Sequence, residues 1–345
     1  TLASFLRKNG YQTAMVGKWH LGMEFPGTIG KRDWSRPVRD MPLDKGFDYF
    51  YGIPASLNYG LLAWFEGRFA KVPPSRWTRK KPNRIALSDY RIAPPYLAEQ
   101  REDLMEVAPD FVDSECLTRF TDQAIKWIRS VAPDARKGLP FFLYLPLTGP
   151  HKPVTPHKRF VGKTGLGPYG DFVMNVDDAV GQVLKALDET KLADNTLVLF
   201  TSDNGSFMYR VEYEDDHVKT PSKQQYHSKS HTANGPWRGT KADIWEGGHH
   251  VPFFARWPGK VEAGSQCARV ITHTDLLATA ADLAGARIPK GAAADSYSYL
   301  PLLLGKEKQY SRPPVIHHSS SGMFAIREGD WKLILGNGSG GRQQP

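Results

Sequence analysis

The sequence predicts an α/β fold: a mixed, mainly parallel sheet sandwiched by helices, with a small antiparallel subdomain near the C-terminus. Three short apolar runs, at 11–16, 141–145 and 197–200, are typical of strands buried on both faces. Amphipathic helical stripes lie between these runs, which is the strand–helix–strand order of a parallel sheet. Two further apolar runs, at 323–327 and 331–335, flank a Glu-Gly-Asp turn and predict an antiparallel hairpin.

Composition bounds the class of protein. Of 345 residues, 40% are hydrophobic and 23% are charged, which is typical of a globular protein. No apolar run approaches the length of a membrane span, so none is expected. The formal net charge of +9 favours anionic substrates or polyanionic partners. Two cysteines, Cys116 and Cys267, allow at most one disulfide and leave the redox compartment open.

The length suits one large α/β domain, at 1–290, followed by a smaller antiparallel domain at 291–345. The chain begins at Thr1 without an initiator methionine, and it stops soon after a predicted strand. We interpret it as a fragment or a processed chain, in which the first domain lacks its N-terminal part and the second is truncated. The oligomeric state is left open.

The first predicted helix, at 1–9, ends at Gly10 and leads into the strand at 11–16. That strand runs into Gly-Lys18-Trp-His20-Leu-Gly. A lysine and a histidine two residues apart, at the carboxyl end of a strand, can both point at one bound anion. The motif alone is a weak signal, because a surface loop explains it equally well.

Residues 24–109 are rich in proline, aromatic and charged residues and show little periodicity. We interpret them as a long excursion over the carboxyl edge of the sheet. Within it, residues 68–91 hold eight Lys or Arg against one acid, with Trp77 and Tyr90 interleaved. Such a stretch can bind nucleic acid or a sulfated polysaccharide. A solvated loop is the commoner explanation, and no nucleic-acid partner is expected.

The strand at 141–145 ends in a proline-rich segment that carries His151 between prolines. A helical stripe at 172–187 then delivers the chain to the strand at 197–200. Directly after that strand stand Asp203 and Asn204, and ligands of open α/β sheets bind just beyond the carboxyl ends of strands. A carboxylate and an amide are hard oxygen ligands that suit Ca²⁺ or Mg²⁺. An Asx-type turn is the alternative, and for this motif alone it is the commoner one.

A polar excursion at 206–234 carries His217, His227 and His231. After it, Lys241 lies in a glycine-bracketed segment that can approach an anion closely. A strand at 251–257 and a helix at 275–284, stopped by Gly285, follow.

Taken together, the blocks resemble the ordered signatures of the type I (arylsulfatase-like) sulfatases, which belong to the alkaline-phosphatase superfamily. The four blocks are Gly17-Lys-Trp-His-Leu-Gly22, Thr148-Gly-Pro-His151, Thr201-Ser-Asp-Asn-Gly205, and Gly239-Thr-Lys241 through Glu246-Gly-Gly248. In addition, Phe324 through Leu333 resembles the opening of the family's C-terminal subdomain. The resemblance runs from Thr1 to about Leu335, and it implies a sulfatase/alkaline-phosphatase-like fold. Four blocks in order, with familiar spacers, are a much stronger signal than any one of them.

The resemblance implies roles for individual residues. Asp203 and Asn204 match the second pair of Ca²⁺ ligands of that family. Lys18 and Lys241 match lysines that hold the sulfate oxygens. Two fixed ammonium groups and a divalent cation can stabilise the charge that spreads over a sulfuryl group in flight.

The histidines carry over in the same way. His20 matches the histidine beside the nucleophile, and His151 matches one near the leaving-group oxygen, where it can protonate the departing alcohol. His231 and Arg238, just before the Lys241 block, are weaker candidates for substrate contacts. His249-His250 departs from the family, which often has isoleucine and arginine there, and this affects packing or anion contacts.

One departure concerns the nucleophile. The family makes a formylglycine from a Cys/Ser-x-Pro-x-Arg motif that precedes the Gly-Lys-Trp-His-Leu-Gly block, and its first two metal-ligand aspartates lie earlier still. No such motif precedes Lys18, and neither Cys116 nor Cys267 fits the pattern. The segment Val72-Pro-Pro-Ser-Arg76 mimics it with valine at the nucleophile position, and we regard it as a coincidence. The nucleophile is therefore expected in a missing N-terminal segment.

The sequence thus predicts a calcium-dependent sulfuric ester hydrolase that removes sulfate from a sulfated carbohydrate or an aryl or alkyl sulfate. One alternative is a phosphate monoester or diester hydrolase of the same superfamily, although two lysines beside Asp-Asn favour sulfate. A second alternative is a non-catalytic binder of sulfated glycans, which a truly absent nucleophile favours. The resemblance implies a periplasmic or secreted protein.

Overall fold

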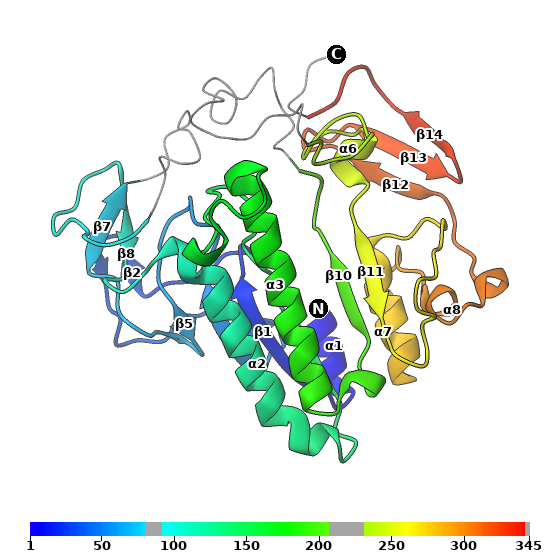
Figure 1. Cartoon of the computed structure of the whole chain (residues 1–345), viewed down its shortest axis with the longest axis horizontal. Coiled ribbons are helices and arrows are strands. Elements are labelled where there is room, and N and C mark those ends of the chain that lie inside the picture. The colour runs from blue at the N-terminus through cyan, green and yellow to red at the C-terminus, as the bar shows by residue number, and fades with distance from the viewer. Residues whose placement is uncertain (80–91, 207–230, 342–345) are drawn as a thin grey trace. The chain divides into compact units, whose positions relative to one another are not determined.

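A computed structural model describes residues 1–79, 92–206 and 231–341 of the chain (Figure 1). The described residues form two compact units, one from Thr1 to Leu192 and one from Ala193 onward. Each unit is described by itself. The predicted domain boundary at residue 290 stays a prediction.

The first unit is built on a five-stranded mixed sheet with the strand order β6-β5-β4-β1-β9. Its centre, β1 (Gln12–Lys18), runs parallel to both of its neighbours, β4 (Tyr49–Ile53) and β9 (Phe141–Tyr144). At the other edge, β5 (Phe65–Glu66) and β6 (Phe69–Ala70) are added antiparallel. The predicted mixed, mainly parallel sheet is confirmed.

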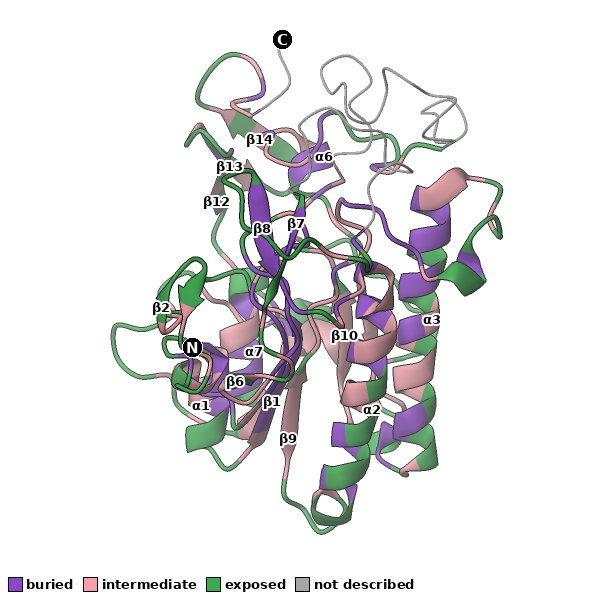
Figure 2. Cartoon of the chain, turned by 90° about the vertical axis from the view of Figure 1, so that its left-hand side faces the viewer, coloured by how far each residue is buried: buried purple, intermediate pink, exposed green. Residues whose placement is uncertain are grey.

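Helices cover both faces of this sheet (Figure 2). On one face lies α1 (Leu2–Lys8), which begins at a capping box between Thr1 and Ser4. On the other face α2 (Cys116–Ala135) and α3 (Gly167–Glu189) pack side by side (Figures 1 and 2). The predicted apolar stripe of α2 is buried throughout, from Leu117 to Val131, because it faces the sheet and α3. The helical sandwich is therefore as predicted.

The interpretation of residues 24–109 as a loop excursion is wrong in part, because this region supplies β4, β5 and β6 to the main sheet. It also forms two small antiparallel pairs. These are β2 (Gly27–Thr28) with β3 (Lys31–Arg32), and β7 (Arg76–Arg79) with β8 (Leu104–Val107). Most of these strands have only two to four residues, too few to show a period of two.

Tertiary contacts, rather than local pattern, stabilise the same region. Trp64 is fully buried and stacks on Phe111 with ring centroids 4.7 Å apart. Arg32 and Glu106 form a nearly buried ion pair at 2.7 Å, and Glu106 also accepts a hydrogen bond from the Gly30 amide at 2.8 Å. Both contacts join segments that lie far apart in the sequence, which a local pattern cannot reveal.

Short 3-10 helices connect the larger elements. In the first unit they are η1 (Pro42–Lys45), η3 (Asp113–Glu115) and η4 (Lys158–Phe160). In the second unit they are η5 (Ala193–Asn195), η6 (His273–Asp275) and η7 (Glu307–Gln309).

The second unit holds an antiparallel pair, β10 (Val198–Thr201) with β11 (Phe253–Arg256). The helices α6 (Glu246–His249), α7 (Leu276–Ala284) and α8 (Leu300–Leu303) belong to the same unit. The predicted helix at 275–284 corresponds to α7, which ends at Gly285 in the left-handed conformation (φ 59°).

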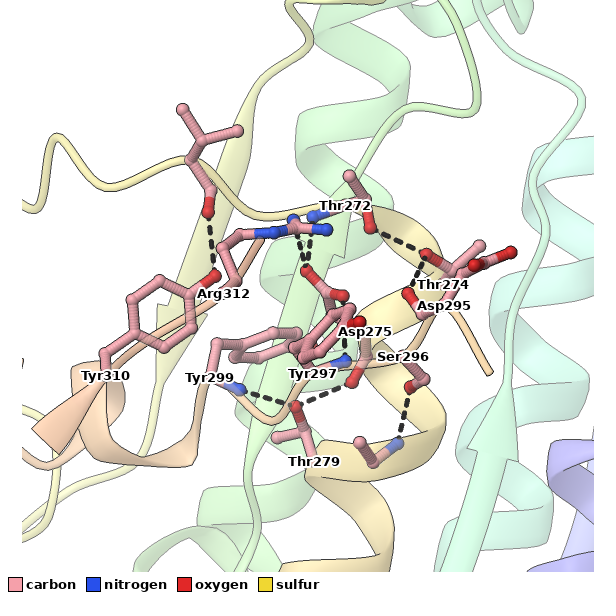
Figure 3. A network of polar contacts seen from close by, with 12 residues as sticks. Thr272, Thr274, Asp275, Thr279, Asp295, Ser296, Tyr297, Tyr299, Tyr310 and Arg312 are labelled. Atoms are coloured by element: carbon pink, nitrogen blue, oxygen red, sulfur yellow. Dashed lines mark hydrogen bonds and ion pairs between the residues drawn. The ribbon is translucent and has the colours of Figure 1, made fainter. Parts of the chain in front are cut away.

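The predicted C-terminal antiparallel sheet is confirmed and gains one strand. The hairpin consists of β13 (Phe324–Glu328) and β14 (Trp331–Ile334), and β12 (Val315–His318) pairs with β13 on its other side. The chain that leads into β12 is held by a buried ion pair between Arg312 and Asp275, at 2.9 Å (Figure 3).

Asp275 is fully buried and has several further partners in this network (Figure 3). Its carboxylate accepts hydrogen bonds from the amides of Thr272, at 2.7 Å, and Tyr297, at 3.1 Å. A buried carboxylate is tolerated only when it is paired and hydrogen-bonded in this way. No described helix is long and apolar enough to cross a membrane.

Candidate functional site

The predicted site residues fall into two groups, one in each unit. In the first unit, Lys18 is the last residue of β1, and its amide donates to the carbonyl of Pro146, just past the end of β9. Gly17 permits this contact: its φ is 142°, and a Cβ there would lie 2.2 Å from the Pro146 oxygen. The loops that follow β1 and β9 are therefore in direct backbone contact.

His20 is held in an uncommon conformation. Its φ is 63°, in the left-handed region that non-glycine residues rarely adopt. The Trp19 amide donates to the Ile53 carbonyl at 3.1 Å, and the His20 amide donates to the Pro54 carbonyl at 2.8 Å. The turn after β1 thus continues to pair with the end of β4, which fixes the backbone of His20 while its side chain stays exposed.

Two residues that sequence reasoning missed contact the His20 ring. Ser56, which is buried, places its hydroxyl oxygen 3.3 Å from His20 Nδ1. The ring centroid of Tyr59 lies 5.1 Å from that of His20. Both residues follow β4, at the same edge of the sheet as Lys18. Recognition of Tyr49–Ile53 as a parallel strand would have directed attention to this turn.

His151 lies in the loop after β9. Its amide donates to the Thr148 carbonyl at 3.1 Å, and its Nδ1 is within hydrogen-bond distance of the Lys152 carbonyl. His151 is half-buried, and Pro150 and Pro153 flank it in the sequence. Lys18, His20 and His151 therefore stand on the carboxyl-end loops of two neighbouring parallel strands, where ligands of α/β sheets bind.

In the second unit, Asp203 and Asn204 form the bend that directly follows β10. Asp203 is exposed and Asn204 is half-buried. The Ser202 hydroxyl donates to the Asn204 carbonyl at 3.0 Å, and the Gly205 amide donates to the Gly248 carbonyl at 3.1 Å. The bend is therefore tied to the glycine segment that follows Lys241.

Asn234, also missed by sequence reasoning, joins this bend to the Lys241 loop. Its Oδ1 accepts from the Ser206 amide at 2.7 Å, and its Nδ2 donates to the carbonyls of Ser206, at 2.8 Å, and Gly239, at 3.1 Å. The Lys241 amide also donates to Ser206 O, at 3.3 Å. The backbone of the Lys241 loop is therefore held against Ser206, two residues after the Asp203-Asn204 bend.

Glycines make this close approach possible. A Cβ on Gly205 would lie 1.7 Å from the Gly247 oxygen, and one on Gly247 would lie 2.1 Å from the Gly239 oxygen. No side chain fits at such distances, so three backbone segments pack directly on one another. The glycine-rich sequence around Lys241 was a signal of this close packing.

The C-terminal sheet completes the Lys241 loop. The Ile244 amide donates to the Ser339 carbonyl at 2.7 Å. Lys332, on β14, donates to the Ile244 carbonyl and pairs with Glu246 at 2.9 Å. Burial opposes ionisation of Glu246, but the hydrogen bond and charge of Lys332 still hold its pKa below the usual range.

The weaker candidates for substrate contacts are Arg238 and His231. The Arg238 guanidinium stacks over Trp245 at 3.6 Å from the ring centroid, and the Arg238 carbonyl accepts from the Gly247 amide. His231 is exposed. His217 and His227 lie outside the described residues.

The two histidines that depart from the family pattern both pack against rings. His250 stacks on Trp237 with centroids 4.4 Å apart, and His249 contacts His317 of β12 at 4.5 Å. Burial lowers the pKa of His317 to about 4, and it lowers the pKa of His249 as well. The His249–His317 contact therefore packs α6 against the C-terminal sheet.

A Ser-x-Pro-x-Arg pattern does occur after Lys18, at Ser35-Arg-Pro-Val-Arg39, and sequence reasoning passed over it. The Ser35 hydroxyl donates to Asp33, and Arg39 pairs with Glu24 at 3.0 Å. The pattern follows the Lys18 block instead of preceding it, so it does not supply the motif in the order that the resemblance requires.

The residues after β10 suit a hard cation. Neither the carboxylate of Asp203 nor the side-chain amide of Asn204 is engaged in a hydrogen bond or ion pair with another described residue. Adjacent carboxylate and amide oxygens match the ligand preference of Ca²⁺. Across residues 1–79, 92–206 and 231–341, no group of three or more His, Cys, Asp and Glu is placed to hold a metal. The bend therefore fits part of a calcium site.

These features define a class of protein. In the first unit, a lysine and two histidines stand at the carboxyl ends of parallel strands, which suits binding of an oxyanion. The comparison with known families specifies the class further. Residues 1–286 match the family model described as Sulfatase. The chain belongs to the sulfatase family.

Several relatives are similar along most of the chain. An N-acetylgalactosamine-6-O-sulfatase of Bacteroides thetaiotaomicron is 30% identical over 97% of this chain and 66% of the relative. Human steryl-sulfatase is 31% identical over 95% of the chain and 58% of the relative. Human N-acetylgalactosamine-6-sulfatase is 29% identical over 96% of this chain and 53% of the relative. The chain thus spans about half to two thirds of the length of these relatives.

Solved structures show the same fold. One, from work on the metabolism of multiple glycosaminoglycans by Bacteroides thetaiotaomicron, is 30% identical with a TM-score of 0.76, covering 97% of this chain and 70% of that one. A sulfatase from Pseudoalteromonas sp. is 23% identical with a TM-score of 0.66, covering 98% and 65%. The sulfatase fold expected from the resemblance is confirmed.

Proposed function

We propose that this protein is a sulfuric ester hydrolase that removes sulfate from a sulfated carbohydrate. Membership of the sulfatase family supports the class of reaction. The observation that carries the proposal is the pair of cationic loops: Lys18 at the end of β1, and Lys241 tied to the Asp203-Asn204 bend. Each loop presents an ammonium group of the kind that holds a sulfate oxygen.

The lysines act on charge. As the bond between sulfur and the bridging oxygen breaks, negative charge grows on the sulfuryl oxygens and on the leaving oxygen. Lys18 and Lys241 stabilise the first of these charges, because a fixed cation needs no reorganisation when the charge develops. Asp203 and Asn204 would hold the calcium ion, which supplies further positive charge at the sulfate when bound.

The histidines act on protons. His151 donates a proton to the bridging oxygen of the sugar as its bond to sulfur breaks, so that the sugar leaves as an alcohol; the proton comes from the ring nitrogen that does not face the Lys152 carbonyl. His20 assists the release of sulfate from the covalent intermediate, with its orientation set by Ser56 through Nδ1. The nucleophile in this proposal is a formylglycine from a segment that precedes Thr1.

The substrate class rests on two observations. Two of the relatives are named for N-acetylgalactosamine 6-sulfate. The net charge of +9 favours a polyanionic glycan over a neutral steroid sulfate. A sulfated glycan is an extracellular substrate, so we also propose a periplasmic or secreted location.

The first experiment joins mass spectrometry with an assay on the protein from its natural source. We expect a peptide upstream of Thr1 that contains Cys/Ser-x-Pro-x-Arg with its first residue converted to formylglycine. We also expect release of sulfate from N-acetylgalactosamine 6-sulfate, reduced at least a hundredfold by Lys241→Ala or Lys18→Ala, because each removes transition-state stabilisation. Near wild-type rates in both variants contradict the assignment.

The same assay separates the alternatives. Faster release of phosphate from galactose 6-phosphate than of sulfate from the sulfated sugar identifies a phosphate ester hydrolase. A third candidate function is a non-catalytic binder of sulfated glycans. Salt-dependent binding of a sulfated glycan without turnover, in a native chain that begins at Thr1, supports that function.

A further inference from the structure

One aromatic side chain beside His20 has no role in the proposed chemistry. Tyr59 follows β4, and 53% of its surface is exposed to solvent. Its ring centroid lies 5.1 Å from that of His20, with 53° between the ring planes. A large, exposed aromatic ring next to a candidate catalytic histidine offers an apolar surface at the place where substrate is expected to bind.

The turn that carries Tyr59 is firmly anchored. The Tyr59 amide donates to the Ser56 carbonyl at 3.0 Å. Leu57 and Leu61, on either side, are only 2% and 4% exposed. Gly60 completes the turn with a φ of 58°. The backbone of Tyr59 is thus fixed by buried neighbours, while its ring is left at the surface.

We propose that Tyr59 is the platform on which the sugar ring of the substrate stacks, which makes it a specificity-determining residue of this protein. The inference rests on the proposed function. The C–H face of a pyranose is apolar, and an aromatic ring covers such a face at a small cost in side-chain entropy, since tyrosine has two rotatable angles. A sugar stacked on the Tyr59 ring would lie beside His20. Its sulfate ester, with the bridging oxygen, would then lie close to the candidate catalytic residues.

The contacts of His20 separate this role from a positioning role. The His20 backbone is held by the carbonyl of Pro54, and its Nδ1 faces Ser56. Neither contact involves Tyr59. Loss of the Tyr59 ring also removes its contact with the His20 ring, so the two roles are told apart by a ligand that has no ring to stack.

Binding to the chain as described tests the proposal, because it needs no nucleophile. Two ligands are titrated by calorimetry: N-acetylgalactosamine 6-sulfate, which has a ring, and methyl sulfate, which has none. We expect Tyr59→Ala to weaken binding of the sugar sulfate about tenfold, the effect of losing one aromatic contact. Binding of methyl sulfate is expected to be unchanged, and Tyr59→Phe, which keeps the ring, is expected to bind both ligands as the wild type does.

Phe69→Ala is the matched control. Phe69 is another exposed aromatic residue of the first unit, 47% exposed, but it lies on β6 at the far edge of the sheet. This variant should bind both ligands like the wild type. Thermal unfolding of each variant checks that it is folded, and Tyr59→Leu, which keeps an apolar side chain without a ring, replaces Tyr59→Ala if the latter unfolds.

The outcomes distinguish failure of the Tyr59 platform from failure of the proposed function. If Tyr59→Ala weakens both ligands equally, Tyr59 positions His20 and the platform is overturned. The platform is also overturned if the variant binds the sugar sulfate like the wild type, or if the wild type prefers methyl sulfate. If the wild type binds neither ligand, the sulfate site itself is missing, and the proposed function is overturned together with the platform that rests on it.

Discussion

The two units hold their candidate residues by different means. In the first unit, the Lys18–His20 turn extends the pairing of parallel strands, and its hydrogen bonds run to the backbone at the ends of β4 and β9. In the second unit, the Asp203-Asn204 bend is held by packed glycine backbones and by the side chain of Asn234. The first site belongs to a sheet, whereas the second is assembled from loops.

The two groups of residues therefore differ in which substitutions they should tolerate. Backbone pairing between strands does not depend on which side chain stands at a position, so the first turn tolerates substitutions outside its glycines. A site built on glycine contacts and one asparagine depends on those residue types. Four predictions test this comparison, from the largest expected effect to the smallest.

Gly205→Ala should be the most damaging change. The new Cβ would lie 1.7 Å from the Gly247 oxygen, so two backbone segments must separate. We expect the free energy of unfolding to fall by about 3 kcal/mol or more, measured by urea denaturation. The control is Gly181→Ala in α3, where nothing lies within 4 Å of the new atom and a gain of about 0.5–1 kcal/mol is expected. Equal effects of the two changes would refute the role assigned to glycine packing.

Asn234→Ala should rank second. It removes the three hydrogen bonds that the Asn234 side chain makes with Ser206 and Gly239. We expect a loss of about 1–3 kcal/mol and weaker binding of calcium, because the bend that carries Asp203 loosens. Asn234→Asp keeps the acceptor and loses the donor, so it should fall between the alanine variant and the wild type. Calorimetry with Ca²⁺ and urea denaturation measure the two effects, and a stable variant with unchanged calcium affinity contradicts the prediction.

The pH dependence of the second unit should come next. Burial lowers the pKa of His317 to about 4 in the folded protein, against about 6.5 in an unfolded chain. The unfolded state therefore binds more protons between these values, and stability falls as the pH drops from about 6.5 toward 4. Urea denaturation of the wild type and of His317→Gln over this range checks the sign. A variant that keeps the full pH dependence rules out His317 as its source.

Ser56→Ala should have the smallest effect on stability, about 1 kcal/mol or less, because it removes a single contact. Its effect on His20 is more specific. Without Ser56, the Nδ1 of His20 loses its partner, so the tautomer balance and the ¹⁵N chemical shifts of the ring should change. Unchanged shifts indicate that Ser56 does not orient His20. Thr148→Ala, a buried hydroxyl in the neighbouring loop, serves as the control and should leave the His20 spectrum unaltered.

Long, strongly patterned elements of the fold could be predicted from the sequence. The strands at 11–16, 141–145 and 197–200, the stripes within α2 and α3, and the C-terminal hairpin are all present. The strand Tyr49–Ile53 was not predicted, although it lies beside β1 in the sheet. It is short and interrupted by Gly52, whose missing side chain is required by the Gly17 oxygen, 1.9 Å from where its Cβ would lie.

The candidate site residues also fall into those that the sequence predicted and those that it did not. Lys18 ends β1, and His20, His151 and the Asp203-Asn204 bend lie in loops that follow predicted strands. The order of elements placed them there, and the family resemblance singled them out. Ser56 and Tyr59 follow the strand that was missed, and the resemblance had no motif there. Asn234 lies 28 residues from its partner Ser206, in a polar segment without a pattern. An asparagine in such a segment is common, and only the folded chain shows which carbonyls it reaches.

During synthesis of the chain, the Lys241 loop can make all of its contacts only after the C-terminal sheet has been synthesised. Lys332 donates to the carbonyl of Ile244, 88 residues earlier in the chain, and Ser339 accepts from the Ile244 amide. A ribosome adds about 5–20 residues each second, so the loop waits roughly 5–20 seconds after its own synthesis for the strand that completes it. During translation, the Lys18 turn has its strand partners long before the Lys241 loop does. The second half of the candidate site is therefore the last to form.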